Sequence, residues 1–333
     1  MSKKIAALVL DKGSAQRIYG PEQLAAIREL AELRDGVLTR EALAEAPALL
    51  EGVQLMFSGW GAPLLDAKLL AAAPRLEAVF YGAGSIRYML TPEFWARGIV
   101  ITSSWQANAV PVAEFVEALV ILSLKRFWES SRGCTSPAGF RHPKAIGAYG
   151  ASVGLVSLGM VGKMTAERLH RHDLKLFAYD PFFSQEKADA LGFGITMLPL
   201  DTLFATCDIV SLHAPNLPTT QKMITGALLA SMKPGATFIN TARGAVVDEI
   251  AMIETLRSRP DLLALLDVTN PEPPAEGSPL YTLPNVVLSP HIAGSMGDEC
   301  KRMGDLAVEQ CRQYLAGQTP QWRITREMAE TLA

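Results

Sequence analysis

The sequence predicts an α/β protein with two domains, each built on a doubly wound parallel sheet. The chain of 333 residues is long for a single compact core, which favours two domains. Hydrophobic residues make up 49% and charged residues 20%, a balance that lets a globular chain bury a large core. Short apolar runs also alternate with helical patterns along most of the chain, and this alternation is typical of parallel sheets covered on both faces.

The pattern that indicates a ligand most clearly ends at Asp180. An apolar strand candidate, 153–158, is followed by the glycine-rich turn 159–162, a helix from Lys163 and a second strand that stops before Asp180. Such a turn lets backbone N–H groups approach a pyrophosphate at the helix N-terminus, and the acid accepts hydrogen bonds from ribose hydroxyls. Asp180 lies 18 residues after Gly162, close to the expected interval. We therefore predict a dinucleotide site here.

The glycine fingerprint departs from its usual form at one position. Ser157 stands where the first glycine serves a tight turn, so its Cβ is expected to move the loop slightly. The simpler alternative is an ordinary turn between strand and helix, in which Gly159 and Gly162 only permit close packing. Asp180 is followed by Pro181-Phe182-Phe183, with no adjacent arginine to take a 2′-phosphate, and this favours NAD over NADP.

Charge and cysteine usage argue against several other classes of protein. The net charge of −3 gives no electrostatic reason to expect a nucleic-acid or anionic-membrane partner. The first apolar run, 5–10, is too short for a signal peptide, and no later run approaches a membrane span. We expect a cytoplasmic protein without a metal site, because the four cysteines form no C-x-x-C pair and no ligand cluster. They are Cys134, Cys207, Cys300 and Cys311.

The first domain is expected to be discontinuous, formed by 1–106 together with 299–333. Its predicted strands are 5–10, 53–57, 76–81 and 99–103. Its predicted helices are 22–33, 62–73, 92–96 and, after the chain returns, 297–316 with Gly317 as its stop.

The dinucleotide-binding domain is expected at 107–298. It begins with a long apolar helix at 107–125, and a loop rich in Gly, Pro, Ser and Arg follows at 130–144. Six strands are predicted, the number in a full doubly wound dinucleotide domain. They are 153–158, 174–179, 208–212, 237–241, 263–268 and 285–289.

Three polar side chains follow strands of this second sheet: Arg243, Glu272 and His291. Ligands bind beyond the carboxyl ends of parallel strands, so we expect all three at one edge. Histidine exchanges a proton near neutral pH, and a nearby carboxylate orients it and stabilises the imidazolium. The planar fork of arginine suits a carboxylate and polarises the adjacent carbonyl. The set predicts hydride exchange with a 2-oxo acid, for which the cofactor supplies the hydride.

Each of these residues also has a simpler interpretation. Taken alone, Arg243 could form a surface ion pair. Glu272 could be a solvated turn residue in a proline-rich loop, and His291 could be a hydrogen-bonded histidine of the core. Their shared place on a sheet that already carries a cofactor turn favours the functional interpretation.

Five segments together resemble the D-isomer-specific 2-hydroxyacid dehydrogenase family. The resemblance runs from about residue 76 to residue 294, with 29 residues from Arg243 to Glu272 and 19 from Glu272 to His291. The segments are Val112-Ala113-Glu114, Ser211-Leu212-His213-Ala214-Pro215, Asn240-Thr241-Ala242-Arg243-Gly244, Asp267-Val268 with Glu272-Pro273, and Ser289-Pro290-His291-Ile292-Ala293-Gly294.

The resemblance implies a role for each site residue. Arg243 would bind and polarise the substrate, His291 would be the general acid/base and Glu272 would support it. The substrate carboxylate would be held by backbone N–H groups at Ala83, Gly84 and Ser85, within the 81–85 loop. Asp267 would contact the nicotinamide carboxamide. The cofactor-binding residues implied are Gly159, Met160, Val161, Gly162, Asp180, His213, Pro215, Thr241, Ala242, Asp267 and Gly294.

The family further implies NAD as cofactor, two Rossmann-like or flavodoxin-like domains with a cleft between them, and a homodimer through the cofactor domain. Met89 and Thr269 stand where many members have Asp and Phe, and Arg87 has no assigned role, so the substrate stays open. Glyoxylate, hydroxypyruvate, pyruvate-like acids and phosphoglycerate are all candidates. One alternative function is an NAD(H)-sensing, corepressor-like binding protein. Another is formate dehydrogenase, against which Glu272 argues because formate enzymes carry Gln there.

Overall fold

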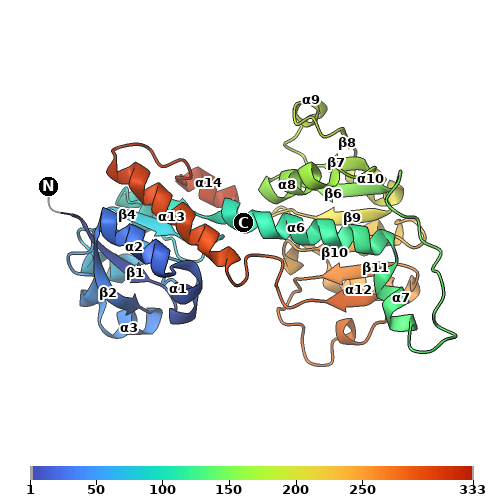
Figure 1. Ribbon diagram of the computed structural model, residues 1–333, viewed down its shortest axis with the longest axis horizontal. Coiled ribbons are helices and arrows are strands. Elements are labelled where there is room, and N and C mark those ends of the chain that lie inside the picture. Colours follow the sequence, from blue (N-terminus) through green and yellow to red (C-terminus); the bar gives the residue numbers. More distant parts are fainter. Residues whose placement is uncertain (1–2, 332–333) are drawn as a thin grey trace. The chain divides into compact units, whose positions relative to one another are not determined.

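The computed structural model describes residues 3–331, and the chain forms two compact units (Figure 1). Unit 1 runs to Asn108 and resumes at Ser295, and unit 2 is Ala109–Gly294. Each unit is an α/β structure on a parallel sheet, which confirms the predicted fold class.

The sheet of unit 1 has five parallel strands in the order β2-β1-β3-β4-β5, the flavodoxin-like order. The prediction of four strands was wrong, because it did not include β2. This strand begins at Glu32, inside the helix that was predicted to continue to Leu33. No residue of β2 is buried, so this edge strand lacks the apolar run that marks a central strand. The strands are β1 (Ile5–Val9), β2 (Glu32–Leu38), β3 (Leu55–Ser58), β4 (Ala78–Tyr81) and β5 (Val100–Ser103).

Helices cover both faces of this sheet, as Figure 1 shows for α2 and α13 on one face. The helix predicted from residue 62 begins only at Ala67, because Asp66 accepts a hydrogen bond from the Leu69 N–H and caps it there. One face carries α1 (Lys12–Ile18), α2 (Pro21–Leu30) and α13 (Glu299–Leu315). The other carries α3 (Arg40–Glu45), η1 (Pro47–Leu50), α4 (Ala67–Ala72), α5 (Pro92–Ala96) and α14 (Arg326–Thr331).

The sheet of unit 2 has seven parallel strands in the order β12-β11-β10-β9-β6-β7-β8. Strand order reverses between β6 and β9, and such a switch point is where dinucleotides bind. Six strands had been predicted; β8 was missed because it has three residues, of which only Ile195 is buried. The strands are β6 (Ser152–Val156), β7 (Lys175–Tyr179), β8 (Ile195–Met197), β9 (Ile209–Leu212), β10 (Thr237–Asn240), β11 (Leu263–Leu266) and β12 (Val286–Leu288).

The helices of unit 2 also lie on both faces of its sheet. The loop predicted at 130–144 was partly wrong, since α7 extends to Gly133. Arg126 is the N-cap residue of α7 and has a φ of +55°, and its ion pair with Glu129 lies in the first turn of that helix. The helices are α6 (Trp105–Leu124), α7 (Phe127–Gly133), α8 (Met160–Leu169), α9 (Gln185–Asp189), α10 (Leu200–Thr206), α11 (Gly226–Ala230), η2 (Gly244–Val246), α12 (Glu249–Ser258) and η3 (Pro279–Tyr281).

Helix α6 is the longest helix in the described part of the chain. The expectation that no apolar run approaches a membrane span was wrong for this helix. Within residues 3–331 it is the one helix whose length and composition would allow it to cross a membrane, with a mean hydropathy of 1.7. More than half of that apolar stretch is buried inside the protein, as in the core helix of a globular fold.

Candidate active site

The glycine-rich turn connects β6 to α8 in the geometry that a pyrophosphate requires. Gly159 caps α8 and Met160 is its first residue, so the unpaired N–H groups of the first turn face out from the helix end. A Cβ at Gly162 would lie 2.2 Å from the Ser157 carbonyl oxygen, so only glycine permits this close approach of helix and turn. The residues present therefore fit a dinucleotide.

His213 lies across the switch point from this turn. It follows β9, and its backbone N–H donates to the carbonyl oxygen of Val156, the last residue of β6, at 2.9 Å. Burial lowers the pKa of the His213 imidazole to about 4, so the ring is neutral at physiological pH. Neither ring nitrogen has a hydrogen-bond partner among the described residues. Pro215 follows in the same loop, where its carbonyl oxygen accepts from Thr220.

Arg243 lies in a turn that the Asn240 side chain stabilises through two hydrogen bonds. The Asn240 side chain accepts from the Ala242 N–H at 3.0 Å and donates to the Arg243 carbonyl oxygen at 3.2 Å. Burial lowers the pKa of the Arg243 guanidinium, and the Glu272 carboxylate opposes that shift, which places the two charges within electrostatic reach. A Cβ at Gly244 would lie 2.0 Å from the Thr269 carbonyl carbon, so the Arg243 turn packs directly on the loop that carries Glu272.

The side chains of His291 and Glu272 are in direct contact. Nδ1 of His291 lies 2.6 Å from Oε1 of Glu272, and each side chain is about half exposed. A carboxylate accepts only, so Nδ1 carries the hydrogen and Nε2 is left to exchange a proton.

The loop that carries His291 is fixed by Asp267. This buried carboxylate accepts from the Ser289 hydroxyl at 2.6 Å and from the N–H groups of Ile292 and Ala293, each at 2.9 Å. His291 itself has a φ of +54°, in the left-handed region that non-glycine residues rarely adopt. Asp267 thus stabilises the backbone on both sides of this unusual conformation.

Three supporting residues were missed at the sequence level. Asn240 and Ser289 act as described above, and Glu249 accepts from the Asn270 N–H at 2.8 Å, which anchors the loop before Glu272. Each is a polar residue at a strand end or helix start beside a predicted motif, and that position is the only signal the sequence offers.

The structure brings the predicted catalytic residues and all the predicted cofactor residues together in unit 2. Thr241 and Ala242 lie in the Arg243 turn, and Gly294 ends the His291 loop. A hollow of about 380 Å³ adjoins the His291–Glu272 pair, with the buried Thr269 in its lining.

The predicted carboxylate-binding residues Ala83, Gly84 and Ser85 belong to unit 1, directly after β4. The Ser103 hydroxyl contacts the carbonyl oxygens of Ala83 at 2.9 Å and Gly84 at 2.6 Å and so fixes the loop. Met89, which replaces a common Asp, is fully buried and packs in the core of this unit.

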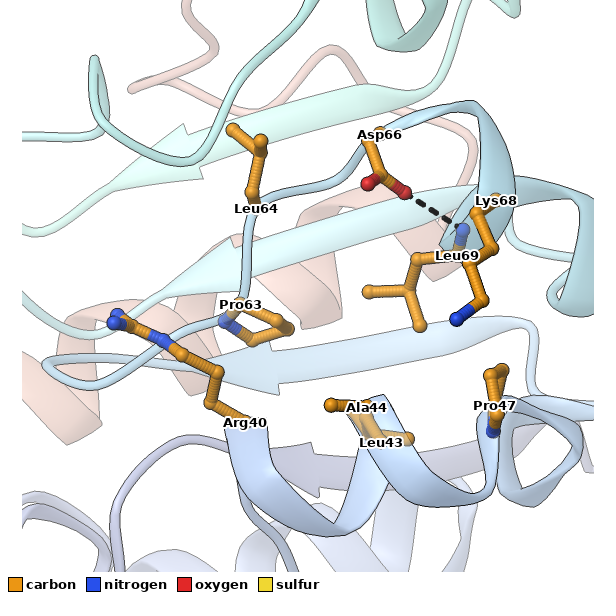
Figure 2. Close-up of a pocket in the computed structure, with 9 residues that line it drawn as sticks. All are labelled: Arg40, Leu43, Ala44, Pro47, Pro63, Leu64, Asp66, Lys68 and Leu69. Atoms are coloured by element: carbon orange, nitrogen blue, oxygen red, sulfur yellow. Dashed lines mark hydrogen bonds between the residues drawn. The ribbon is translucent and has the colours of Figure 1, made fainter.

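A further hollow of about 230 Å³ lies in unit 1 beside α3 (Figure 2). Its polar side chains already serve the fold: Arg40 donates to the Ala62 carbonyl oxygen at 2.9 Å, and Asp66 caps α4. These contacts fix the segment that leads from β3 to α4.

Comparison with known proteins agrees with this geometry. A family model described as "D-isomer specific 2-hydroxyacid dehydrogenase, NAD binding domain" matches residues 118–293. The chain is 32% identical over 272 residues to a glyoxylate reductase from Thermofilum pendens, covering 79% of each protein. The structure is also similar to that of the TT0316 protein from Thermus thermophilus, with a TM-score of 0.77, 28% identity and coverage of 96% and 100% of the two chains.

A longer curated relative is D-3-phosphoglycerate dehydrogenase from Mycobacterium bovis. The identity is 32% over 301 residues, which is 90% of this chain but 56% of the relative. The chain therefore spans about half the length of the phosphoglycerate dehydrogenases it matches.

Proposed function

Because the chain belongs to the D-isomer specific 2-hydroxyacid dehydrogenase family, we propose that it is an NAD-dependent reductase of a small 2-oxo acid. The observation that carries this proposal is the 2.6 Å contact between His291 and Glu272, in the same unit as the glycine-rich turn. Curated relatives are named D-3-phosphoglycerate dehydrogenase and glyoxylate reductase, so we propose glyoxylate, hydroxypyruvate or a phosphoglycerate-like acid as substrate.

The chain's own residues would hold the cofactor at its pyrophosphate and at its adenosine ribose. Backbone N–H groups at Met160, Val161 and Gly162 would bind the pyrophosphate, and Asp180 would accept from the adenosine ribose. When bound, the nicotinamide supplies or accepts the hydride.

His291 would move the proton that accompanies the hydride. During reduction Nε2 gives a proton to the carbonyl oxygen of the substrate, and during oxidation it takes that proton back. Glu272 keeps Nδ1 as the donor and stabilises the imidazolium through the 2.6 Å contact. Both actions require the ring to be held at a fixed angle, which the Asp267 contacts to the loop provide.

Arg243 would bind the substrate through its guanidinium. The group is partly buried, where a charge-assisted hydrogen bond to a carboxylate or carbonyl oxygen is stronger than in water. Within unit 1, we keep the backbone N–H groups of the Ala83–Ser85 loop as proposed donors to a substrate carboxylate.

We also propose a homodimer through unit 2 and a cytoplasmic location. Large exposed hydrophobic side chains are typical of interfaces, and unit 2 has four within 127–149: Phe127, Phe140, Ile146 and Tyr149. Light scattering after size exclusion should give twice the 36.0 kDa of one chain, and a mass of one chain would refute the dimer. Three of the four cysteines are buried free thiols, which suits a reducing compartment.

A panel of short 2-oxo acids tests the proposed activity. Loss of NADH absorbance should accompany at least one acid, with NADPH less efficient because Asp180 repels a 2′-phosphate. If NADH binds but no acid in the panel is reduced, the dehydrogenase proposal fails and a binding function takes its place.

A further inference from the structure

We propose that Ser157 is a positioning residue that fixes the Asp180 carboxylate for the adenosine ribose of the dinucleotide. This inference rests on the proposed function, because it concerns how the chain holds NAD. Ser157 occupies the first fingerprint position, where a glycine is usual.

The backbone at Ser157 explains why glycine is usual there. Its φ is +80°, a conformation that glycine adopts freely and that strains an L side chain. The Ser157 carbonyl oxygen lies toward Gly162, where a Cβ would be only 2.2 Å from it. The same peptide unit directs the Leu158 N–H to Oδ2 of Asp180, at 2.8 Å. Glycine alone would satisfy all of these backbone requirements.

The serine side chain adds one contact that glycine cannot make. Its hydroxyl Oγ lies 3.2 Å from the same Oδ2 of Asp180. Oδ2 therefore receives two donors from consecutive residues, the Ser157 hydroxyl and the Leu158 N–H. The serine thus adopts a strained backbone conformation and makes a second hydrogen bond to Asp180, the acid of the proposed cofactor site.

The remaining contacts of Asp180 decide which oxygen the ribose meets. Oδ1 accepts from the Phe182 N–H at 2.8 Å. A carboxylate has about four acceptor sites, two on each oxygen, so the Oδ2 sites are filled and one site remains on Oδ1. Ser157 thereby leaves Oδ1 as the oxygen that receives a ribose hydroxyl, and it prevents the carboxylate from rotating.

Two substitutions separate the hydroxyl from the backbone conformation. Ser157→Ala removes the hydroxyl and keeps the strained Cβ, whereas Ser157→Gly removes both. The apoprotein of each variant is titrated with NADH and NADPH by calorimetry, and its thermal midpoint is measured without cofactor. Ser184→Ala serves as the control, because it removes a serine hydroxyl that caps α9 by accepting from the Lys187 N–H rather than by contacting Asp180.

Both Ser157 variants should bind NADH about three- to tenfold more weakly than the wild type, the size expected for the net contribution of one ordinary hydrogen bond. They should also discriminate less against NADPH, while Ser184→Ala binds like the wild type. The thermal midpoint should rise in Ser157→Gly relative to Ser157→Ala, since only the first relieves the positive φ.

Wild-type affinity for NADH in both variants would overturn the inference. So would a loss confined to Ser157→Ala, because Ser157→Gly would then bind NADH normally without the hydroxyl. A wild-type chain that binds no NADH would instead refute the proposed function, so the two failures are distinguishable.

Discussion

His291 and Glu272 stand 19 residues apart in the chain, yet the imidazole Nδ1 and the carboxylate Oε1 are separated by 2.6 Å. The contact joins the loop after β11 to the loop after β12, two neighbouring parallel strands whose carboxyl ends share one edge. Arg243 follows β10, the next strand in the same sheet, and packs on the Glu272 loop through Gly244. Strand order alone therefore brings the three side chains to one place.

Replacing Glu272 with Gln should lower turnover in keto-acid reduction. The amide keeps the shape of the side chain but removes the charge that stabilises the imidazolium. The loss of turnover should be no larger than the 10²- to 10⁴-fold that a general acid contributes to the rate. The nearby exposed Glu276→Gln is the control, and wild-type turnover in Glu272→Gln would leave Glu272 without this role.

Asp267→Asn should destabilise the protein and reduce turnover together. The amide NH₂ group replaces one acceptor, while the N–H groups of Ile292 and Ala293 and the Ser289 hydroxyl still point toward the side chain. A buried donor without an acceptor lowers the free energy of unfolding by about 1–3 kcal/mol. Urea denaturation and steady-state kinetics test this. Wild-type stability and turnover in the variant would mean that the carboxylate is dispensable for the His291 loop.

Gly162→Ala should abolish tight NADH binding and lower the thermal midpoint. The new methyl group would lie 2.2 Å from the Ser157 carbonyl oxygen, so the turn or α8 must shift. Gly133→Ala at the end of α7 is a matched control, because a Cβ there meets no atom within 4 Å. Equal NADH affinity in the two variants would contradict the close approach seen at Gly162.

The buried elements could be predicted from the sequence because their apolar runs are continuous. Central strands such as β6 and β9 are buried at every residue, and the dinucleotide turn lies between conspicuous glycines. Edge strands could not be found in this way. Every residue of β2 is exposed or half-buried, and β8 has only three residues, so neither shows the pattern of a core strand.

The site could be predicted as a set of residues but not as a set of contacts. Arg243, Glu272 and His291 follow strands, and strand ends are visible in a sequence. The contacts of Asp267 with backbone N–H groups 25 and 26 residues away depend on how two loops fold against each other. Likewise the residue type at position 157 suggests a shifted loop, whereas the structure shows a serine in the conformation of a glycine.

His213 should make the protein sensitive to acid. Burial lowers its pKa from 6.5 to about 4, so the unfolded chain binds a proton more readily than the folded one. The neutral buried ring therefore costs no free energy of unfolding above pH 6.5, but the protein loses stability as the pH falls from 6.5 toward 4. At pH 5 the loss is about 2 kcal/mol of the free energy of unfolding. His213→Gln should therefore lose less stability than the wild type between pH 7 and pH 5 in urea denaturation. The exposed His142→Gln should behave like the wild type, and an identical loss in all three proteins would contradict the buried neutral ring.

The most direct measurement compares the wild type with His291→Asn in the reduction of the best 2-oxo acid from the panel. Asparagine tolerates the φ of +54° at this position, so the loop should keep its conformation while it loses its proton donor. Turnover should fall about 10²- to 10⁴-fold with only a modest change in NADH affinity. Turnover within threefold of the wild type would contradict the assignment of His291 as the acid/base of a 2-hydroxyacid dehydrogenase.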